Sequence, residues 1–266
     1  MNVNITREHG VEWRVADAVG HLVLDRPARA NALDLHTGLA LARAIHAVVD
    51  ATPRVIVLSA RGSIFCAGGD IKSFAAAGDA FESIILDPLQ ELLPAYRRLA
   101  AAPCPVVSVV NGPVGGAGIG LALAGDFVLA STTLKLRTGY AAIGLSPDVG
   151  ASWFLARRVG AVRALQWFMT SEVISAEQCL AAGAVDALHA PEALSDAAES
   201  LTRRLLAAAP GSLAAMKRLC QGVEARTLAE HLTLEAQLLG ERARSADARE
   251  GVGAFIEKRA PRFTGR

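Results

Sequence analysis

The 266-residue sequence has few cysteines, few aromatic residues and almost no net charge, and these shortages exclude several classes of protein. A formal net charge of +1 leaves no excess of lysine and arginine for a phosphate backbone, so we expect no nucleic-acid partner. No apolar run approaches the ~20 residues that span a membrane, and the N-terminus has no secretory segment. The four cysteines and six histidines lack disulfide or metal-ligand spacing. The sequence therefore predicts a cytoplasmic protein without a metal site or a membrane partner.

What the sequence has is apolar surface, since 52% of its residues are hydrophobic, enough for the core of an α/β domain. The expected elements are strands at 11–16 and 21–25 joined around Val19-Gly20, a helix at 34–51 capped by Asp34, strands at 54–59 and 104–110 with a helix between them that ends near residue 101, and short strands at 126–131 and 133–136. Alternating strands and helices indicate mainly parallel strands with right-handed crossovers.

The pattern becomes almost wholly helical from about residue 151. We therefore expect an α/β core over residues 1–200, followed by a helical region over residues 201–266.

Two glycine-rich turns carry the strongest functional signal. Each follows a short apolar strand: FCAGGDIK occupies residues 65–72, and NGPVGGAG occupies residues 111–118. Small residues at a strand-to-helix turn let a ligand approach backbone N–H groups at the positive end of the helix dipole. One such turn could serve a phosphate or a dinucleotide, but two could hold a single oxygen from two sides. That arrangement is an oxyanion hole.

These turns resemble those of the crotonase (enoyl-CoA hydratase/isomerase) superfamily. The resemblance extends over nearly the whole chain, through LDRP at 24–27, IGLSPDVG at 143–150 and AFIEKR at 254–259. It implies the crotonase fold, an α/β spiral of ββα units. It also implies that the C-terminal helices pack on neighbouring copies in a homotrimer or a dimer of trimers.

The resemblance also assigns roles to residues. Gly69 and Ala117 would supply the two oxyanion-hole amides, and an acyl-CoA thioester would be the substrate, with no separate cofactor. The residues expected to contact CoA or the acyl group are Arg26, Ala28, Ala67, Asp70, Ile71, Lys72, Tyr140, Phe255 and Lys258. Surface ion pairs are the alternative for Arg26 and Lys72, and helix packing is the alternative for Phe255 and Lys258. The pocket walls are expected from residues 73–93 and from the C-terminal helices.

The sequence departs from the hydratases at the catalytic acid and base. Hydratases hold a water between two glutamates, whereas the corresponding positions here are Gly120 and Tyr140. Without that pair, ordinary hydration of 2-enoyl-CoA is disfavoured. Tyr140 could instead donate a hydrogen bond to the substrate or close the pocket by packing.

Asp148 is the remaining candidate for proton transfer. Its Pro-Asp-x-Gly setting is similar to that of phenylacetate-pathway acyl-CoA isomerases, which also lack the glutamate pair. The resemblance implies an isomerase in which Asp148 moves a proton between two carbons of the enolised chain, with a pKa raised by an apolar pocket. Alternatively, Asp148 caps the helix that begins near Ser152. A hydrolytic acyl-CoA enzyme and a non-catalytic acyl-CoA-binding protein remain the competing functions.

Overall fold

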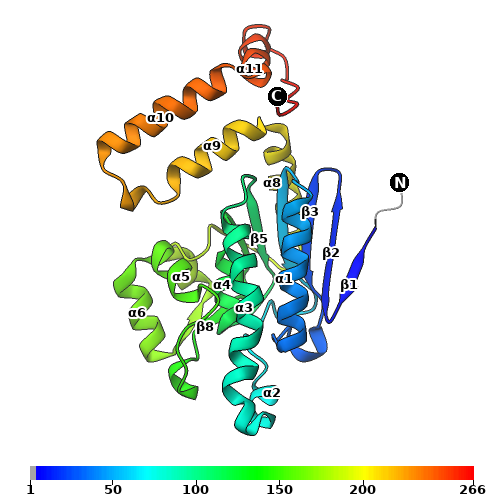
Figure 1. The fold of residues 1–266 in the computed structure, drawn as a ribbon, viewed down its shortest axis with the longest axis vertical. Helices are drawn as coiled ribbons and strands as arrows, with labels where there is room; N and C mark the ends of the chain where they lie inside the picture. The colour runs from blue at the N-terminus through cyan, green and yellow to red at the C-terminus, as the bar shows by residue number, and fades with distance from the viewer. Residues whose placement is uncertain (1–3) are drawn as a thin grey trace.

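The computed structural model describes residues 4–266, which form two β-sheets enclosed by helices (Figure 1). The larger sheet has seven strands: β1 (Thr6–Glu8), β2 (Val11–Ala16), β3 (Val19–Leu24), β4 (Val55–Ala60), β5 (Val106–Val110), β7 (Phe127–Ser131) and β10 (Ala187–His189), in that spatial order. The first three strands are antiparallel, and the pairs from β3 to β10 are all parallel. The smaller sheet contains β6 (Val114–Gly115), β8 (Lys135–Arg137) and β9 (Val173–Ser175).

The chain passes from one sheet to the other and then into a helix. Strand β5 is followed by β6 and helix α4 (Ala117–Leu123), and β7 is followed by β8 and, after a loop, by α5 (Ala151–Val159). This order repeats the ββα unit, so the predicted crotonase spiral is confirmed. The predicted parallel pairing is confirmed as well.

Helices cover both faces of the larger sheet. Val107 and Val109 of β5 point to one face, where they pack with Leu201 of α8 (Leu194–Ala207). Val106 and Val110 point to the other face and join the core that α1 (Leu35–Asp50) and α3 (Phe81–Ala100) complete. Every residue of β5 is therefore buried, as expected for a parallel strand that is covered twice.

Local rules explain where several elements begin. The Asp34 side chain accepts a hydrogen bond from the Thr37 amide at 2.9 Å, so the predicted cap of α1 is confirmed. The predicted turn at Val19-Gly20 is wrong, because both residues lie in β3 and the hairpin turns at Asp17 and Ala18. These two residues have φ angles of +49° and +64°, as a tight hairpin turn requires.

The last helices extend away from the sheets as an arm (Figure 1). The remaining helices are α2 (Ile71–Ala76), α6 (Ala161–Thr170), α7 (Ala176–Ala181), and the arm helices α9 (Pro210–Cys220), α10 (Leu228–Ala243) and α11 (Ala246–Ile256). An ion pair of 2.7 Å between Lys217 of α9 and Asp126 ties the arm to the core. Helix α8 runs across residue 200, and the division of the chain there stays a prediction. Within residues 4–266, no helix combines the length and apolar character of a membrane span.

Candidate active site

The two glycine-rich turns lie directly against each other. Cys66 pairs with Val114 in an isolated parallel bridge, and the Gly115 amide donates to the Cys66 carbonyl at 2.9 Å. Gly68 has a φ of +94°, and a Cβ built on it would lie 2.8 Å from the Gly115 carbonyl oxygen. Only glycine permits this approach, so the spacing of small residues that the sequence shows is a requirement of the contact.

Two amides are left without an internal partner at this junction. The Asp70 amide donates to the Leu33 carbonyl at 2.9 Å, and the Gly116 amide donates to the Arg137 carbonyl at 3.3 Å. Gly69 directly precedes Asp70, and Ala117 directly follows Gly116. The amides of Gly69 and Ala117 donate no hydrogen bond to any residue of 4–266. Ala117 is the first residue of α4, where helix amides are free. Both residues line the same cavity.

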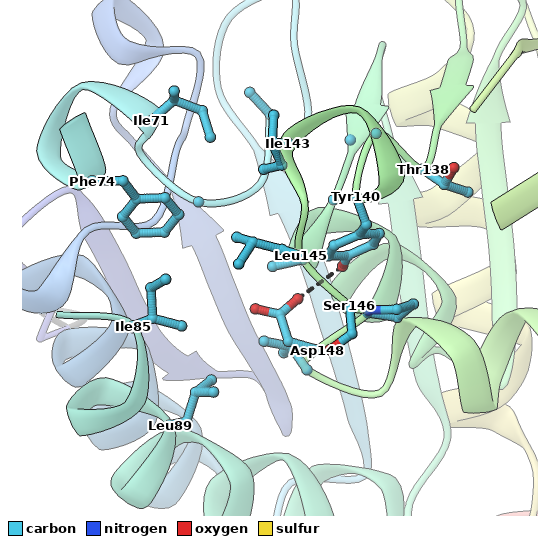
Figure 2. A pocket seen from close by; sticks show the side chains of 18 of the residues that line it. Ile71, Phe74, Ile85, Leu89, Thr138, Tyr140, Ile143, Leu145, Ser146 and Asp148 are labelled. Atoms are coloured by element: carbon cyan, nitrogen blue, oxygen red, sulfur yellow. Dashed lines mark hydrogen bonds between the residues drawn. The ribbon is translucent and has the colours of Figure 1, made fainter. Parts of the chain in front are cut away.

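That cavity has a volume of about 980 Å³ and two dissimilar walls (Figure 2). One wall is apolar and comes from α2 and α3. Its main residues are Ile71, Phe74, Phe81, Ile85, Leu86, Leu89 and Leu93. The other wall is the segment 137–150, which brings Tyr140, Leu145 and Asp148 toward the first wall. The cavity therefore suits a ligand with an apolar body that meets polar groups at one place.

Asp148 supplies the half-buried carboxylate of this cavity. The Tyr140 hydroxyl donates to Asp148 Oδ1 at 2.8 Å, and Oδ2 points toward the apolar wall (Figure 2). Burial raises the pKa of Asp148, and the hydrogen bond from Tyr140 opposes that rise. The result is a carboxylate that holds a proton more tightly than an ordinary aspartate.

The alternative interpretation of Asp148 as a helix cap is wrong. Helix α5 starts at Ala151 with Gly150 at its N-cap, and no side chain caps it. Asp148 contributes only its backbone carbonyl, which accepts from the Ala151 amide at 2.8 Å. Its carboxylate is thus free for the cavity.

The charge of Asp148 acts on three ionisable side chains from different parts of the chain. Tyr140 comes from the same segment, Cys66 from the first glycine turn and Tyr96 from α3. Burial raises the pKa of all three, that of Cys66 to about 12, and the charge of Asp148 adds to each rise. They are therefore neutral at ordinary pH. No sequence pattern marked Tyr96, whose buried hydroxyl has no partner within residues 4–266.

Some of the residues predicted to contact CoA line the cavity, and others lie outside it. Ala67 and Ile71 line the cavity, and the Lys72 side chain is exposed beside them on α2. Ala28 is exposed in a short 3₁₀ turn, Pro27–Arg29. Asp70 is buried and accepts hydrogen bonds from the first amides of α2, so it also has a structural role.

The guanidinium of Arg26 is engaged within the fold. It forms an ion pair of 2.7 Å with Asp34 and donates to the Ala32 carbonyl and to the Thr37 hydroxyl, each at 3.1 Å. The ion-pair alternative raised for Arg26 therefore describes its contacts in this chain.

Phe255 and Lys258 lie outside the cavity. Phe255 is 85% exposed on α11, at the opposite end of the molecule from α2 (Figure 1). The expectation that C-terminal helices supply pocket walls is wrong for this chain, since none of the residues that line the cavity comes from them. The wall expected from residues 73–93 is present. The spacing of four between Phe81, Ile85, Leu89 and Leu93 could have identified the lining face of α3.

The family model for enoyl-CoA hydratase/isomerase matches residues 14–266. The chain belongs to the enoyl-CoA hydratase/isomerase family. Among the relatives of this family, the 1,2-epoxyphenylacetyl-CoA isomerase of Escherichia coli is 36% identical over 255 residues, which cover 95% of this chain and 97% of that protein. A protein named probable enoyl-CoA hydratase from Rhodobacter capsulatus is 35% identical over 258 residues, covering 97% and 99%.

Solved structures of the enoyl-CoA hydratase/isomerase family have the same fold. The crystal structure of a putative enoyl-CoA hydratase/isomerase from Mycobacterium abscessus superposes with a TM-score of 0.90 at 32% identity, covering 96% of this chain and 100% of that one. Members of the family bind acyl-CoA substrates. Relatives named isomerase and hydratase are equally similar to this chain, so the residues of the site must decide between the two reactions.

Proposed function

We propose that the protein is an acyl-CoA isomerase that moves a carbon–carbon double bond along the acyl chain of a CoA thioester. The observation that supports this most directly is the half-buried carboxylate of Asp148, which lines the same cavity as the unengaged amides of Gly69 and Ala117. A base and two hydrogen-bond donors at one cavity are what the formation and collapse of a thioester enolate require.

The proposed reaction needs no group beyond these. With a 3-enoyl thioester, Asp148 removes a proton from C2, and the electrons of that C–H bond shift toward the thioester oxygen to form an enolate. The amides of Gly69 and Ala117 stabilise the negative oxygen, and losing one such donor typically costs about 3 kcal/mol. Asp148 then returns the proton to C4, where the electrons of the original C3–C4 double bond form the new C–H bond. The electrons on the enolate oxygen re-form the thioester carbonyl, the double bond between C1 and C2 moves to C2 and C3, and the carboxylate is restored. No water is consumed and no CoA is released.

The surroundings of Asp148 suit this role. Its raised pKa makes it a stronger base than an ordinary aspartate, and the proton that it takes up can exchange with solvent before the second transfer. Tyr140 holds Oδ1, which leaves Oδ2 to face the substrate. We infer that Tyr140 orients the base and does not itself contact the acyl chain.

Hydration lacks a comparable support. Adding water to a double bond requires one group to activate the water and another to protonate the neighbouring carbon. Gly120 offers no side chain, and the Tyr140 hydroxyl is already given to Asp148. The other carboxylate that lines the cavity, that of Glu82, is exposed on α3.

For CoA itself, we propose a path beside the first glycine turn. Ala67 and Ile71 line the cavity there, and Ala28 is exposed on its short turn. The Lys72 ammonium can form an ion pair with a phosphate of CoA in this region, whereas the guanidinium of Arg26 is already paired with Asp34. Asp70 would support this path by capping α2.

We also infer that the helical arm packs on neighbouring copies, in a homotrimer or a dimer of trimers. Leu228 is 74% and Leu239 is 71% exposed on α10, and large exposed apolar patches mark interaction surfaces. Phe255 and Lys258 could then reach the CoA of a neighbouring copy. Light scattering of the wild type and of Leu228→Asp would test this, since the variant should dissociate to smaller species.

The experiment that tests the reaction is incubation with 2-enoyl, 3-enoyl and ring-bearing CoA thioesters in deuterated water. Deuterium should enter the acyl chain without release of free CoA. Asp148→Asn should slow this exchange at least ~100-fold and leave thioester affinity nearly unchanged, because general-base catalysis contributes about 10²–10⁴. Glu82→Gln is the matched control and should exchange at the wild-type rate.

Other outcomes would point elsewhere. Release of free CoA would indicate a hydrolase, and tight binding without exchange across the panel would indicate a non-catalytic acyl-CoA-binding protein. Exchange at the wild-type rate in Asp148→Asn would assign the base to another group.

A further inference from the structure

Helix α4 meets the loop that carries Asp148 at one glycine. Gly120 is buried, and a Cβ built on it would lie 2.0 Å from the Val149 carbonyl oxygen and 3.0 Å from the Ala151 amide nitrogen. The clash would be with backbone and not with the end of a flexible side chain. The close approach of helix and loop therefore depends on the missing side chain at this position.

The loop is strained at the point of contact. Val149 has a φ of +46°, in the left-handed region that β-branched residues avoid, and Gly150 follows with a φ of +74°. The Val149 side chain is only 2% exposed and packs in the main core. Such a conformation persists only where surrounding contacts hold it, and here the contact with α4 and the buried side chain do so.

The close contact at Gly120 and the strained backbone of Val149 both constrain Asp148, which directly precedes Val149 in the chain. The Tyr140 hydroxyl fixes its carboxylate from one side, and the seating of Val149 on Gly120 fixes its backbone from the other. Helix α4 begins at Ala117, three residues before Gly120, a rise of about 4.5 Å along one rigid turn. The base and one of the two amides are thus linked through a single helix.

We propose that Gly120 is a positioning residue, which by lacking a side chain seats Val149 on α4 and so sets the separation between the Asp148 carboxylate and the Ala117 amide. This inference rests on the proposed isomerase function. It also gives a physical reason why a hydratase-type glutamate and this loop exclude each other: any side chain at position 120 would force the loop that bears Asp148 to withdraw.

Kinetics of deuterium exchange test the inference with three variants. Gly120→Ala should lower kcat about 100-fold and leave KM within about threefold, because displacing a catalytic group by about 1 Å costs that much without removing binding contacts. Ser195→Thr is the control, since it also adds one methyl group to a helix, at an exposed position of α8 outside both the cavity and the arm, and it should keep the wild-type rate. Val149→Gly adds no atoms and loosens the loop from its own side, so its kcat should fall about tenfold with KM unchanged.

A second readout does not depend on turnover. Because burial raises the pKa of Asp148, Asp148→Asn should raise Tm at pH 8 more than at pH 4. When Asp148→Asn is combined with Gly120→Ala or Val149→Gly, the difference between its effects on Tm at pH 8 and pH 4 should be smaller, because the displaced carboxylate is more exposed to solvent. If Gly120 had only a structural role, Gly120→Ala would lower Tm but leave the pH-dependent effect of Asp148→Asn on Tm unchanged.

The outcomes separate the two proposals. If the wild type exchanges no deuterium, the isomerase function fails, and the Tm comparison still decides the role of Gly120. If Gly120→Ala does not fold, Val149→Gly carries both measurements. A wild-type kcat together with an undiminished pH-dependent gain in either folded variant would overturn the positioning role.

Discussion

The hydrogen bond from Tyr140 to Asp148 sets the pH at which the proposed base becomes active. Tyr140→Phe removes only the hydroxyl that donates to Oδ1 at 2.8 Å and keeps the ring that closes the cavity. That hydroxyl favours the ionised carboxylate, so it holds the pKa of Asp148 below the value that burial alone would give. Removing it should therefore raise the pKa of Asp148 further.

The size of the shift follows from the strength of the bond. A hydrogen bond to a charged group contributes about 1.5–3 kcal/mol, and one pKa unit corresponds to about 1.36 kcal/mol. The acid limb of the pH–rate profile should thus move upward by about one to two units. Above that limb, where Asp148 is ionised in both proteins, the variant should exchange within about tenfold of the wild-type rate, because the base and both amides remain.

The assay is the pH dependence of deuterium exchange into a 3-enoyl-CoA thioester, measured as kcat/KM between pH 4 and 9. Tyr96→Phe is the matched control, since the charge of Asp148 also acts on that tyrosine but no hydrogen bond joins the two side chains. A limb that stays in place or moves downward in Tyr140→Phe would refute the assignment of Asp148 as the titrating base.

Three further predictions concern stability and specificity. The native state holds the proton of Asp148 more tightly than the unfolded chain, so the contribution of Asp148 to stability falls as pH rises above about 4. Asp148→Asn removes this unfavourable charge and should raise Tm at pH 7 by about 2–4 °C for each kcal/mol of stability gained. A lower Tm in calorimetry would contradict this. Leu89→Trp narrows the apolar wall and should lower kcat/KM at least about tenfold for long acyl chains, with a four-carbon substrate unaffected; equal losses for both would mean that the acyl chain lies elsewhere. Tyr96→Phe removes a buried hydroxyl without a partner and should raise the free energy of unfolding by about 1 kcal/mol, whereas a decrease in urea titration would show that the hydroxyl binds a buried water.

The parts of the fold that the sequence predicted well are those set by local rules. The cap of α1 at Asp34 and the parallel order of the strands follow from short patterns, and the structure has both. The family resemblance added the spiral, which periodicity alone does not specify. The hairpin turn was misplaced because Asp17 and Ala18 adopt positive φ without the glycine that usually marks such a turn.

The contacts that shape the site follow no periodic sequence pattern, and that is why the sequence did not reveal them. The bond between Tyr140 and Asp148 crosses a 3₁₀ turn whose residues follow no regular period. The seating of Val149 on Gly120 joins two segments that lie 29 positions apart, and nothing in either segment marks the other. From the sequence, position 120 carried information only as a missing glutamate, and Tyr140 was expected to contact the substrate or to close the pocket, with no sign that it bonds to Asp148.

In the structure, the two replacements form a consistent set with Asp148. Because position 120 has no side chain, the loop that carries Asp148 packs against α4, and this packing places the Asp148 carboxylate at the cavity. A buried carboxylate needs a donor, and Tyr140 supplies one. A glutamate at position 140 would instead set two negative charges beside each other and drive the pKa of one of them far upward. The hydratase pair and the Asp148 arrangement are therefore alternatives that this backbone cannot hold together, and the absence of the pair is a condition for Asp148 to act as the proposed base.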